Sequence, residues 1–279
     1  MSCSGKAGSN EGQIEGKRRN NALNGKQTGK KAYMRIRFTR GEEVKFISHL
    51  DLMRVFERAV RRSKLPVAYS QGFNPRPGIV FGLPLAVGVA SRGEYADFEL
   101  EREMEPERFM NRLNENLPDA IRVVKAGLKK SKANIMSSIA AADYMLEIFL
   151  REPMVPADAS EKLKMLLKMD SIKVLKESRN KYGEIVTKEI EIRPMILDAG
   201  LAVMMSMPPG YEEYKAAFAI HAKFKAGSKA NLRPELFISA LKQYGGIEVD
   251  SFRIYRENLY SEINGKLVDP LDRSVLSYK

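Results

Sequence analysis

The stretch that decides the fold is Met34–Lys64, which reads MRIRFTRGEEVKFISHLDLMRVFERAVRRSK. Its first five residues alternate between apolar and charged side chains, which is the period of a β-strand. Further along, Ser48 and Asp51 have the spacing of an acidic capping box, so we expect a helix from about His49 to Lys64. The globular region therefore begins with a strand followed by a helix.

The elements after this helix complete the order strand, helix, strands, helix, strand. We expect them at strands near 79–81, 85–89 and 95–100, a helix over 105–117 and a strand over 122–128. This is the element order of a ferredoxin-like α+β unit, which we assign to residues 33–130.

Residues 144–262 repeat this order of elements without repeating the residues themselves. We expect helices over 157–169 and 233–244, and strands over 144–150, 172–175, 185–192, 201–207, 216–224 and 247–255. The sequence thus predicts an α+β fold of two ferredoxin-like units packed together. A linker at 131–143 joins them, and a C-terminal tail at 263–279 follows.

The charge of the chain is unevenly distributed. The net charge is +12, and residues 33–92 hold eleven Lys or Arg against four Asp or Glu, whereas residues 93–120 hold three against nine. Residues 1–32 are also basic, and their Gly-, Asn- and Ser-rich composition predicts a disordered tail. A basic block beside an acidic one favours a polyanionic partner such as RNA. A basic composition alone also occurs in proteins without such a partner.

Composition excludes several kinds of chemistry. With Cys3 as the only cysteine, the chain forms no intrachain disulfide and by itself holds no Fe–S cluster or Cys-rich zinc site. His49 and His221 are the only histidines, so we expect no metal site and no cofactor bound by this chain alone. The longest uncharged stretch, 77–91, is too short for a membrane span, and no apolar leader is visible. We therefore expect a cytoplasmic protein.

Eight segments are the most distinctive part of the sequence: Phe46–Leu52, Phe56–Arg62, Tyr69–Pro77, Leu83–Val89, Glu94–Phe98, Lys188–Pro194, Asn231–Pro234 and Ile254–Tyr260. In this order they resemble the radical-SAM-linked protein family, over about residues 33–262. That bacterial family is found fused behind, or encoded beside, a radical SAM protein with a cobalamin-binding type domain. The resemblance implies a radical SAM protein as partner. Because this chain lacks a CxxxCxxC run, it resembles the stand-alone accessory form.

The loop from Tyr69 to Pro77 has the strongest character of a binding site. Its candidate RNA-binding residues are Tyr69, Gln71, Phe73, Asn74 and Arg76. The two aromatic rings can stack on bases, the two amides can read a base edge, and the guanidinium can bind phosphate. The flanking prolines stiffen the loop and lower the cost of ordering it. The alternative is a structural crossover loop whose aromatic rings belong to the core.

The first helix carries a second candidate surface. Four arginines recur at positions i, i+4, i+7 and i+8 and so share one face, which consists of Arg54, Arg58, Arg61 and Arg62. Glu57 can pair with Arg61, but the face stays basic. A guanidinium suits planar contact with phosphate. The alternative is an ordinary solvated face.

His49 opens the same helix and is the one candidate catalytic residue. A histidine there can act as a general base near neutral pH, as in a metal-independent RNA-processing enzyme. The alternatives are a contact with substrate and a histidine held by local hydrogen bonds. His221 lies in an alternating strand and is expected to be structural.

Four residues of the second half stand in short motifs and form a further candidate set: Arg193, Asn231, Arg233 and Arg256. They can converge on a phosphate or on a carboxylate of a partner, or they can form ion pairs between the two halves. Arg193 and Arg233 precede proline, which biases their backbone toward the extended region.

The resemblance implies an accessory protein of a radical SAM enzyme, and the charge distribution and the chemistry of the loop predict that it is non-catalytic and binds RNA, either tRNA or rRNA, for modification. The first alternative is an RNA-processing or RNA-modifying enzyme that uses His49. The second is a module that binds only protein.

Overall fold

The computed structural model of this 279-residue chain describes residues 31–204 and 206–277. The predicted tail at 1–32 lies, up to residue 30, outside the described residues. Within them the α+β class is confirmed, because the structure contains a nine-stranded sheet, a separate two-stranded sheet and six α-helices. None of the helices in this part of the chain is long and apolar enough to cross a membrane.

The first half forms one antiparallel group of four strands with two α-helices. Its elements are β1 (Ala32–Arg40), the 3-10 helix η2 (Glu42–Val44), α1 (His49–Ser63), β2 (Ile79–Phe81), β3 (Ala90–Leu100), α2 (Pro106–Asn114) and β4 (Ile121–Lys129). The pairings give the strand order β4-β1-β3-β2. The strand expected at 85–89 does not form. That segment turns at Gly88, whose φ of 89° lies in the left-handed region.

The second half repeats this arrangement with an added hairpin. Its elements are α3 (Ile135–Ser138), β5 (Ile139–Leu150), α4 (Pro156–Leu167), β6 (Lys173–Arg179), β7 (Ile185–Glu191), the 3-10 helix η3 (Arg193–Met195), β8 (Ile196–Ala202), β9 (Ala216–Lys225), α5 (Pro234–Gln243), β10 (Ser251–Ile263), β11 (Lys266–Val268) and α6 (Arg273–Ser277). The main strands are antiparallel in the order β10-β5-β9-β8, and β6 pairs only with β7.

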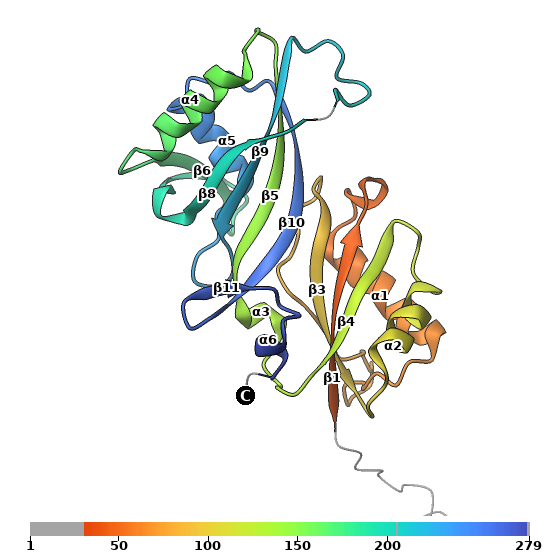
Figure 1. Cartoon of the computed structure of the whole chain (residues 1–279). Helices are drawn as coiled ribbons and strands as arrows, with labels where there is room; N and C mark the ends of the chain where they lie inside the picture. Colours follow the sequence, from red (N-terminus) through yellow and green to blue (C-terminus); the bar gives the residue numbers. More distant parts are fainter. Residues whose placement is uncertain (1–30, 205, 278–279) are drawn as a thin grey trace, which may run out of the picture. The chain divides into compact units, whose positions relative to one another are not determined.

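A short parallel pairing joins the two halves into one sheet. β10 lies between β3 and β5, which Figure 1 shows, and it pairs with β3 at Tyr255–Ala90 and Arg256–Ser91. At this join the strands approach so closely that a Cβ on Gly93 would lie 2.4 Å from the carbonyl oxygen of Glu257. Only glycine fits there, so this residue sets the spacing of the join.

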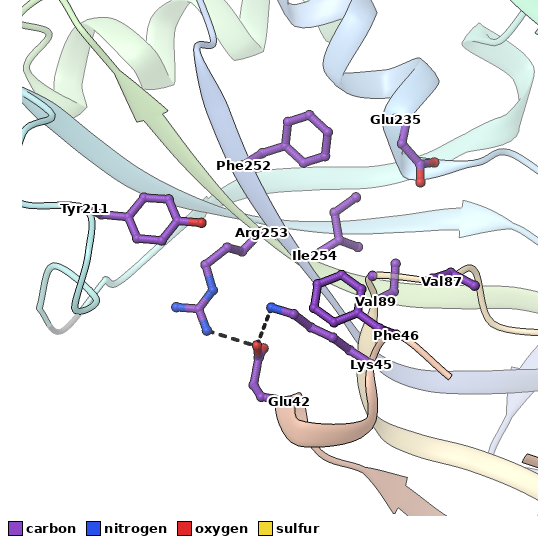
Figure 2. A pocket seen from close by; sticks show the side chains of 11 residues that line it. Glu42, Lys45, Phe46, Val87, Val89, Tyr211, Glu235, Phe252, Arg253 and Ile254 are labelled. Atoms are coloured by element: carbon purple, nitrogen blue, oxygen red, sulfur yellow. Dashed lines mark hydrogen bonds and ion pairs between the residues drawn. The ribbon is translucent and has the colours of Figure 1, made fainter. Parts of the chain in front are cut away.

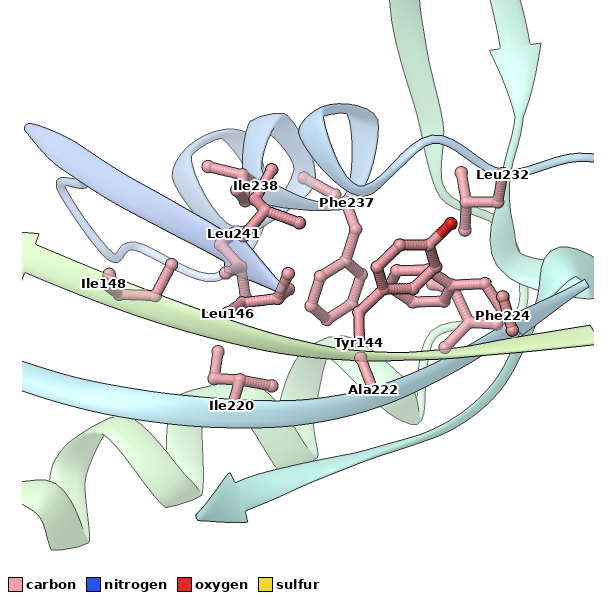
Figure 3. Close-up of a cluster of buried hydrophobic side chains, with 14 of the residues drawn as sticks. Tyr144, Leu146, Ile148, Ile220, Ala222, Phe224, Leu232, Phe237, Ile238 and Leu241 are labelled. Atoms are coloured by element: carbon pink, nitrogen blue, oxygen red, sulfur yellow. The ribbon is translucent and has the colours of Figure 1, made fainter. Parts of the chain in front are cut away.

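Each half has its own apolar core. In the first half, the apolar stripe of α1, with Leu52 and Phe56, packs on Met34, Ile36 and Phe38 of β1. The helix begins as its sequence predicts: the Ser48 hydroxyl accepts a hydrogen bond from the Asp51 backbone N–H at 3.1 Å. In the second half, Figure 3 shows α5 packing through Phe237, Ile238 and Leu241 onto side chains of β5 and β9.

The linker expected at 131–143 is largely structured. It contains α3 and the first residues of β5, because buried polar groups hold it. Asp97 accepts hydrogen bonds from the Ile135 backbone N–H at 2.8 Å and from Lys129 Nζ at 2.7 Å. Lys129 Nζ also donates to the Ala133 carbonyl at 2.6 Å. The connection between the halves is therefore part of the fold.

The C-terminal tail expected at 263–279 is also built into the fold as far as residue 277. It contains β11 and α6, and Leu271 is buried in the core of the second half. Arg35 of β1 donates to the Pro270 carbonyl at 3.1 Å, and the Lys130 N–H donates to the Leu276 carbonyl at 2.9 Å. Charged residues flank Leu271 in the sequence, so its burial could not be predicted from an apolar pattern.

The strand expected at 201–207 is displaced toward the N-terminus. β8 covers Ile196–Ala202, and its pairing with β9 ends at Ala202–Ala219, although β9 itself begins at Ala216. Val203, Met204, Ser206 and Met207 belong to no strand, and Pro208 and Pro209 stop any extension.

Candidate functional site

The loop from Tyr69 to Pro77 projects its central residues into solvent. A β-bridge between Tyr69 and Pro77 closes its base. Above it, the Ser70 N–H donates to the Arg76 carbonyl at 2.8 Å and the Arg76 N–H donates to the Ser70 hydroxyl at 3.0 Å. These contacts hold the base of the loop while its tip stays free.

Four of the five predicted RNA-binding side chains of this loop are exposed: Gln71, Phe73, Asn74 and Arg76. The Phe73 ring is fully exposed, with a relative exposure of 106%. Tyr69 is half-buried at the base of the loop. The structural alternative, a crossover loop with both rings in the core, therefore does not describe Phe73.

The arginine face of α1 is exposed along its whole length, at Arg54, Arg58, Arg61 and Arg62. Arg54 pairs with Asp51 at 3.0 Å, and Arg62 donates to the carbonyl of Asn116. Arg58 and Arg61 make no hydrogen bond or ion pair with any described residue, and the expected Glu57–Arg61 pair is not among the ion pairs of the described chain. Two of the four guanidinium groups are thus available to an external anion.

The structure does not join the loop to the arginine face by direct contacts. No hydrogen bond or ion pair among the described residues links a side chain of 69–77 to one of the four arginines. An RNA that touched both would have to bridge them.

His49 packs against the core of the first half. Its imidazole meets the Phe81 ring edge-on, with centroids 5.5 Å apart. Burial lowers the pKa of His49; the charge of Glu94 opposes this shift and the charge of Arg40 adds to it. Burial therefore favours the neutral form of the imidazole. Among the described residues the imidazole has no hydrogen-bond partner, and its observed contact is the packing against Phe81.

A buried ion pair lies beside His49. Arg256 of β10 is 1% exposed and donates from Nε to Glu94 Oε1 of β3 at 2.7 Å, while its Nη2 reaches Glu94 Oε2 and the Leu83 carbonyl. The Ser91 hydroxyl donates to the same carboxylate at 2.6 Å. Burial is the largest influence on the pKa of Arg256 and lowers it, but the charges and hydrogen bonds of Glu94 and Tyr144 together outweigh burial and raise the pKa. The sequence left two alternatives for Arg256, binding of an anion and an ion pair between the halves. In the structure Arg256 forms the ion pair.

Three of the four second-half candidates line one pocket of about 200 Å³: Asn231, Arg233 and Arg256. Arg233 is exposed at the N-cap of α5, with the extended backbone expected before proline. Arg193 lies elsewhere and begins η3 instead of being extended. Its guanidinium donates to the Met169 carbonyl at 3.1 Å and to the Ile196 carbonyl at 3.3 Å. The four residues therefore do not converge on a single anion site.

A second pocket, of about 290 Å³, adjoins the first and is shown in Figure 2; we call it the interhalf pocket. It is lined by Glu42, Lys45, Phe46, Val87, Gly88, Val89, Tyr211, Glu235, Phe252, Arg253 and Ile254. Glu42 pairs with Lys45 at 2.7 Å and with Arg253 at 3.3 Å, and Arg253 also pairs with Glu147 at 3.3 Å. The two cations of this pocket are thus neutralised within the protein.

Sequence reasoning did not single out Glu235, Phe252 or Arg253, and it used Phe46 only as part of a motif. Phe46 and Arg253 are separated by about two hundred positions and meet only because β10 joins β3. Of these residues only Phe46 lies within a distinctive segment, whereas Glu235, Phe252 and Arg253 lie just outside one. Among the residues that the structure describes, no group of three or more His, Cys, Asp or Glu has the arrangement of a metal site.

The fold defines a class of α+β proteins in which two similar halves share one mixed sheet. Within that class, the chain belongs to a bacterial family. The family model described as "Uncharacterized protein conserved in bacteria (DUF2344)" matches residues 33–234, which is most of the chain. The match begins with β1 and reaches the first residue of α5, so it includes both candidate surfaces of the first half. No curated protein matches the sequence.

Proposed function

We propose that this protein is a non-catalytic accessory protein that binds RNA, either tRNA or rRNA, and presents it to a radical SAM enzyme for modification. The observation that carries the proposal is the loop at 69–77. Its base is held by hydrogen bonds, and its tip presents the Phe73 ring and the Arg76 side chain to solvent. An exposed ring beside a guanidinium and two amides suits a single-stranded base and its phosphate.

The free guanidinium groups of Arg58 and Arg61 support the same proposal. They lie on a fixed helix, and arginine binds phosphate with a planar pair of donors. Together with the loop they give two separate contacts for one polyanion. An extended RNA strand is therefore a better fit than a small anion.

The strand orders of the two halves support a further part of the proposal. Four antiparallel strands in the order fourth, first, third, second, with two helices, suit a ferredoxin-like unit. We therefore propose two such units, with the β6–β7 hairpin inserted in the second. The radical SAM partner rests on the sequence resemblance and not on the geometry.

The proposal assigns His49 a structural role. Its edge contact with Phe81 and its neutral form suit packing. An enzyme that used it as a base would need a substrate to reach a half-buried ring.

Replacing Phe73 with alanine tests the loop. Stacking of a base on an aromatic ring contributes about 1–3 kcal/mol, so we expect Phe73→Ala to weaken tRNA binding about 5- to 150-fold in a filter-binding titration. The ring is fully exposed, so the fold should be unaffected.

The control is Val155→Ala, which removes another exposed apolar side chain, in the second half. It should leave the affinity unchanged. Equal affinities for wild type and Phe73→Ala would remove the loop from the proposal.

A further inference from the structure

One carboxylate of the interhalf pocket has an oxygen that accepts no hydrogen bond from the described residues. Glu235, in the first turn of α5, has its Oε2 buried without a hydrogen-bond partner among the described residues. In Figure 2 its carboxylate points from α5 toward the side of the pocket lined by Val87 and Val89. A buried carboxylate oxygen without a donor is costly, so it favours a ligand that brings one.

The two cationic side chains of the pocket already form ion pairs within the protein, so they do not favour an anionic ligand. Lys45 and Arg253 are both paired with Glu42, and Arg253 is paired with Glu147 as well. A phosphate would have to displace these carboxylates. The pocket therefore suits a neutral ligand that donates hydrogen bonds.

Three aromatic rings also line the pocket. Phe46 comes from the segment between η2 and α1, Phe252 from β10 and Tyr211 from the loop between β8 and β9. Phe46 is 71% exposed and Phe252 is 40% exposed, so neither ring is fully covered by the protein. Rings of this kind at the rim of a small pocket suit a planar ring system that stacks on them.

We propose that the interhalf pocket binds one unpaired guanine base of the RNA, with Glu235 accepting hydrogen bonds from its ring N1–H and its exocyclic amine. This inference rests on the proposed RNA-binding function and adds a base-specific site to it. A carboxylate accepts two donors side by side, and of the four standard bases guanine offers them on its Watson–Crick edge. At about 290 Å³ the pocket has room for a base and not for a folded RNA segment.

The pocket and the loop then have different tasks. The loop at 69–77 and Arg58 and Arg61 hold the strand with little regard to sequence. Glu235 selects which base enters between the halves. Loss of the second task leaves the first intact.

The test uses the full-length protein and fluorescently labelled uridine pentamers that carry guanosine, inosine or adenosine at the centre. Inosine differs from guanosine only by lacking the exocyclic amine. A good bidentate contact discriminates by about 1–3 kcal/mol, so wild type should bind the guanosine pentamer about 5- to 150-fold more tightly than the inosine pentamer in fluorescence anisotropy. Glu235→Gln should abolish this preference, and it should weaken binding of the inosine pentamer less than that of the guanosine pentamer, because inosine offers only the N1–H donor.

Two further variants make the result interpretable. Glu161→Gln changes an exposed carboxylate on α4 and should keep the preference for guanosine. Phe46→Ala truncates an exposed ring, which the fold tolerates, and should weaken binding of the guanosine pentamer more than that of the inosine pentamer. An unchanged urea midpoint shows that each variant is folded.

The outcomes separate the two proposals. Equal binding of all three pentamers by wild type overturns the guanine site and leaves the RNA-binding function standing. If a short arginine-containing peptide then binds wild type but not Glu235→Gln, the pocket takes a cationic side chain of a protein. Binding of no pentamer at all overturns the proposed function, and the guanine site with it.

Discussion

At the scale of single residues, the ion pair of Glu94 and Arg256 decides how the halves meet. Both side chains are removed from water and each satisfies the other, with Ser91 and the Leu83 carbonyl completing the set. Such a pair adds little to stability compared with apolar residues, but losing one partner leaves a buried charge. We therefore expect the pair to favour one arrangement of β3 against β10 more than it adds to stability.

His49 links this region to pH. Its pKa is lowered in the folded chain, mainly by burial, whereas the unfolded chain binds the proton at the ordinary value of about 6.5. As the pH falls from about 7.5 to 5, the unfolded state takes up a proton that the folded state resists, so the free energy of unfolding falls. We expect His49→Phe, which keeps the edge contact with Phe81, to reduce this slope in urea titrations between those pH values.

An unchanged slope in His49→Phe would show that protonation of this imidazole is not linked to folding. Carboxylates whose pKa is lowered, such as Asp51 and Glu191, lose their stabilising interactions only at lower pH. The window above pH 5 therefore isolates the histidine from them.

For single residues, the sequence predicted which side chains are exposed better than it predicted which side chains interact with each other. The proline-flanked loop and the spacing of the arginines indicated which side chains face solvent. Glu235 gave no such signal, because whether a carboxylate is buried without a partner depends on residues far away in the chain.

At the scale of elements, the join between β3 and β10 is the most constrained contact. A side chain at Gly93 would meet the backbone of Glu257 and Asn258, which cannot give way without moving β10. Overpacking of this kind costs about 1–3 kcal/mol. We expect Gly93→Ala to lower the urea midpoint of unfolding by an amount that corresponds to this cost.

Gly200→Ala is the matched control. Gly200 also lies in a strand, β8, but a Cβ there meets nothing within 4 Å. Its urea midpoint should stay near that of wild type. Equal midpoints for the two variants would mean that β3 and β10 are not held as closely as described.

Elements with strong local signals were predicted nearly to the residue. The helix α1 has a capping box at its start and a proline after its end, and β7 was predicted at 185–192 against Ile185–Glu191 in the structure. Its partner β6 was predicted too short, at 172–175, and runs to Arg179. β8 and the segment after β10 were placed wrongly because their positions depend on partner strands. The short run around Leu271 gives no periodic signal of its own.

At the scale of the whole molecule, the two halves share one sheet, because two residues of β10 pair with two residues of β3. The sequence predicted the order of elements in each half. It gave no indication of this parallel pairing, because the paired strands are separated by about 165 positions. The interhalf pocket exists only where the halves meet, so the proposed guanine site depends on this pairing.

We propose that Arg58 and Arg61 of α1 contact RNA phosphates while the loop at 69–77 contacts the bases. The most direct measurement is the salt dependence of binding to a single-stranded RNA between about 50 and 200 mM. Each phosphate contact contributes about 0.7 to the slope of log affinity against log salt, so Arg58→Ala with Arg61→Ala should reduce the slope by about 1.4. The control, Lys164→Ala with Lys168→Ala, removes two exposed charges from the α4 region and should leave the slope unchanged. A wild-type affinity that does not vary with salt, or a slope that the arginine variant leaves intact, would contradict the account.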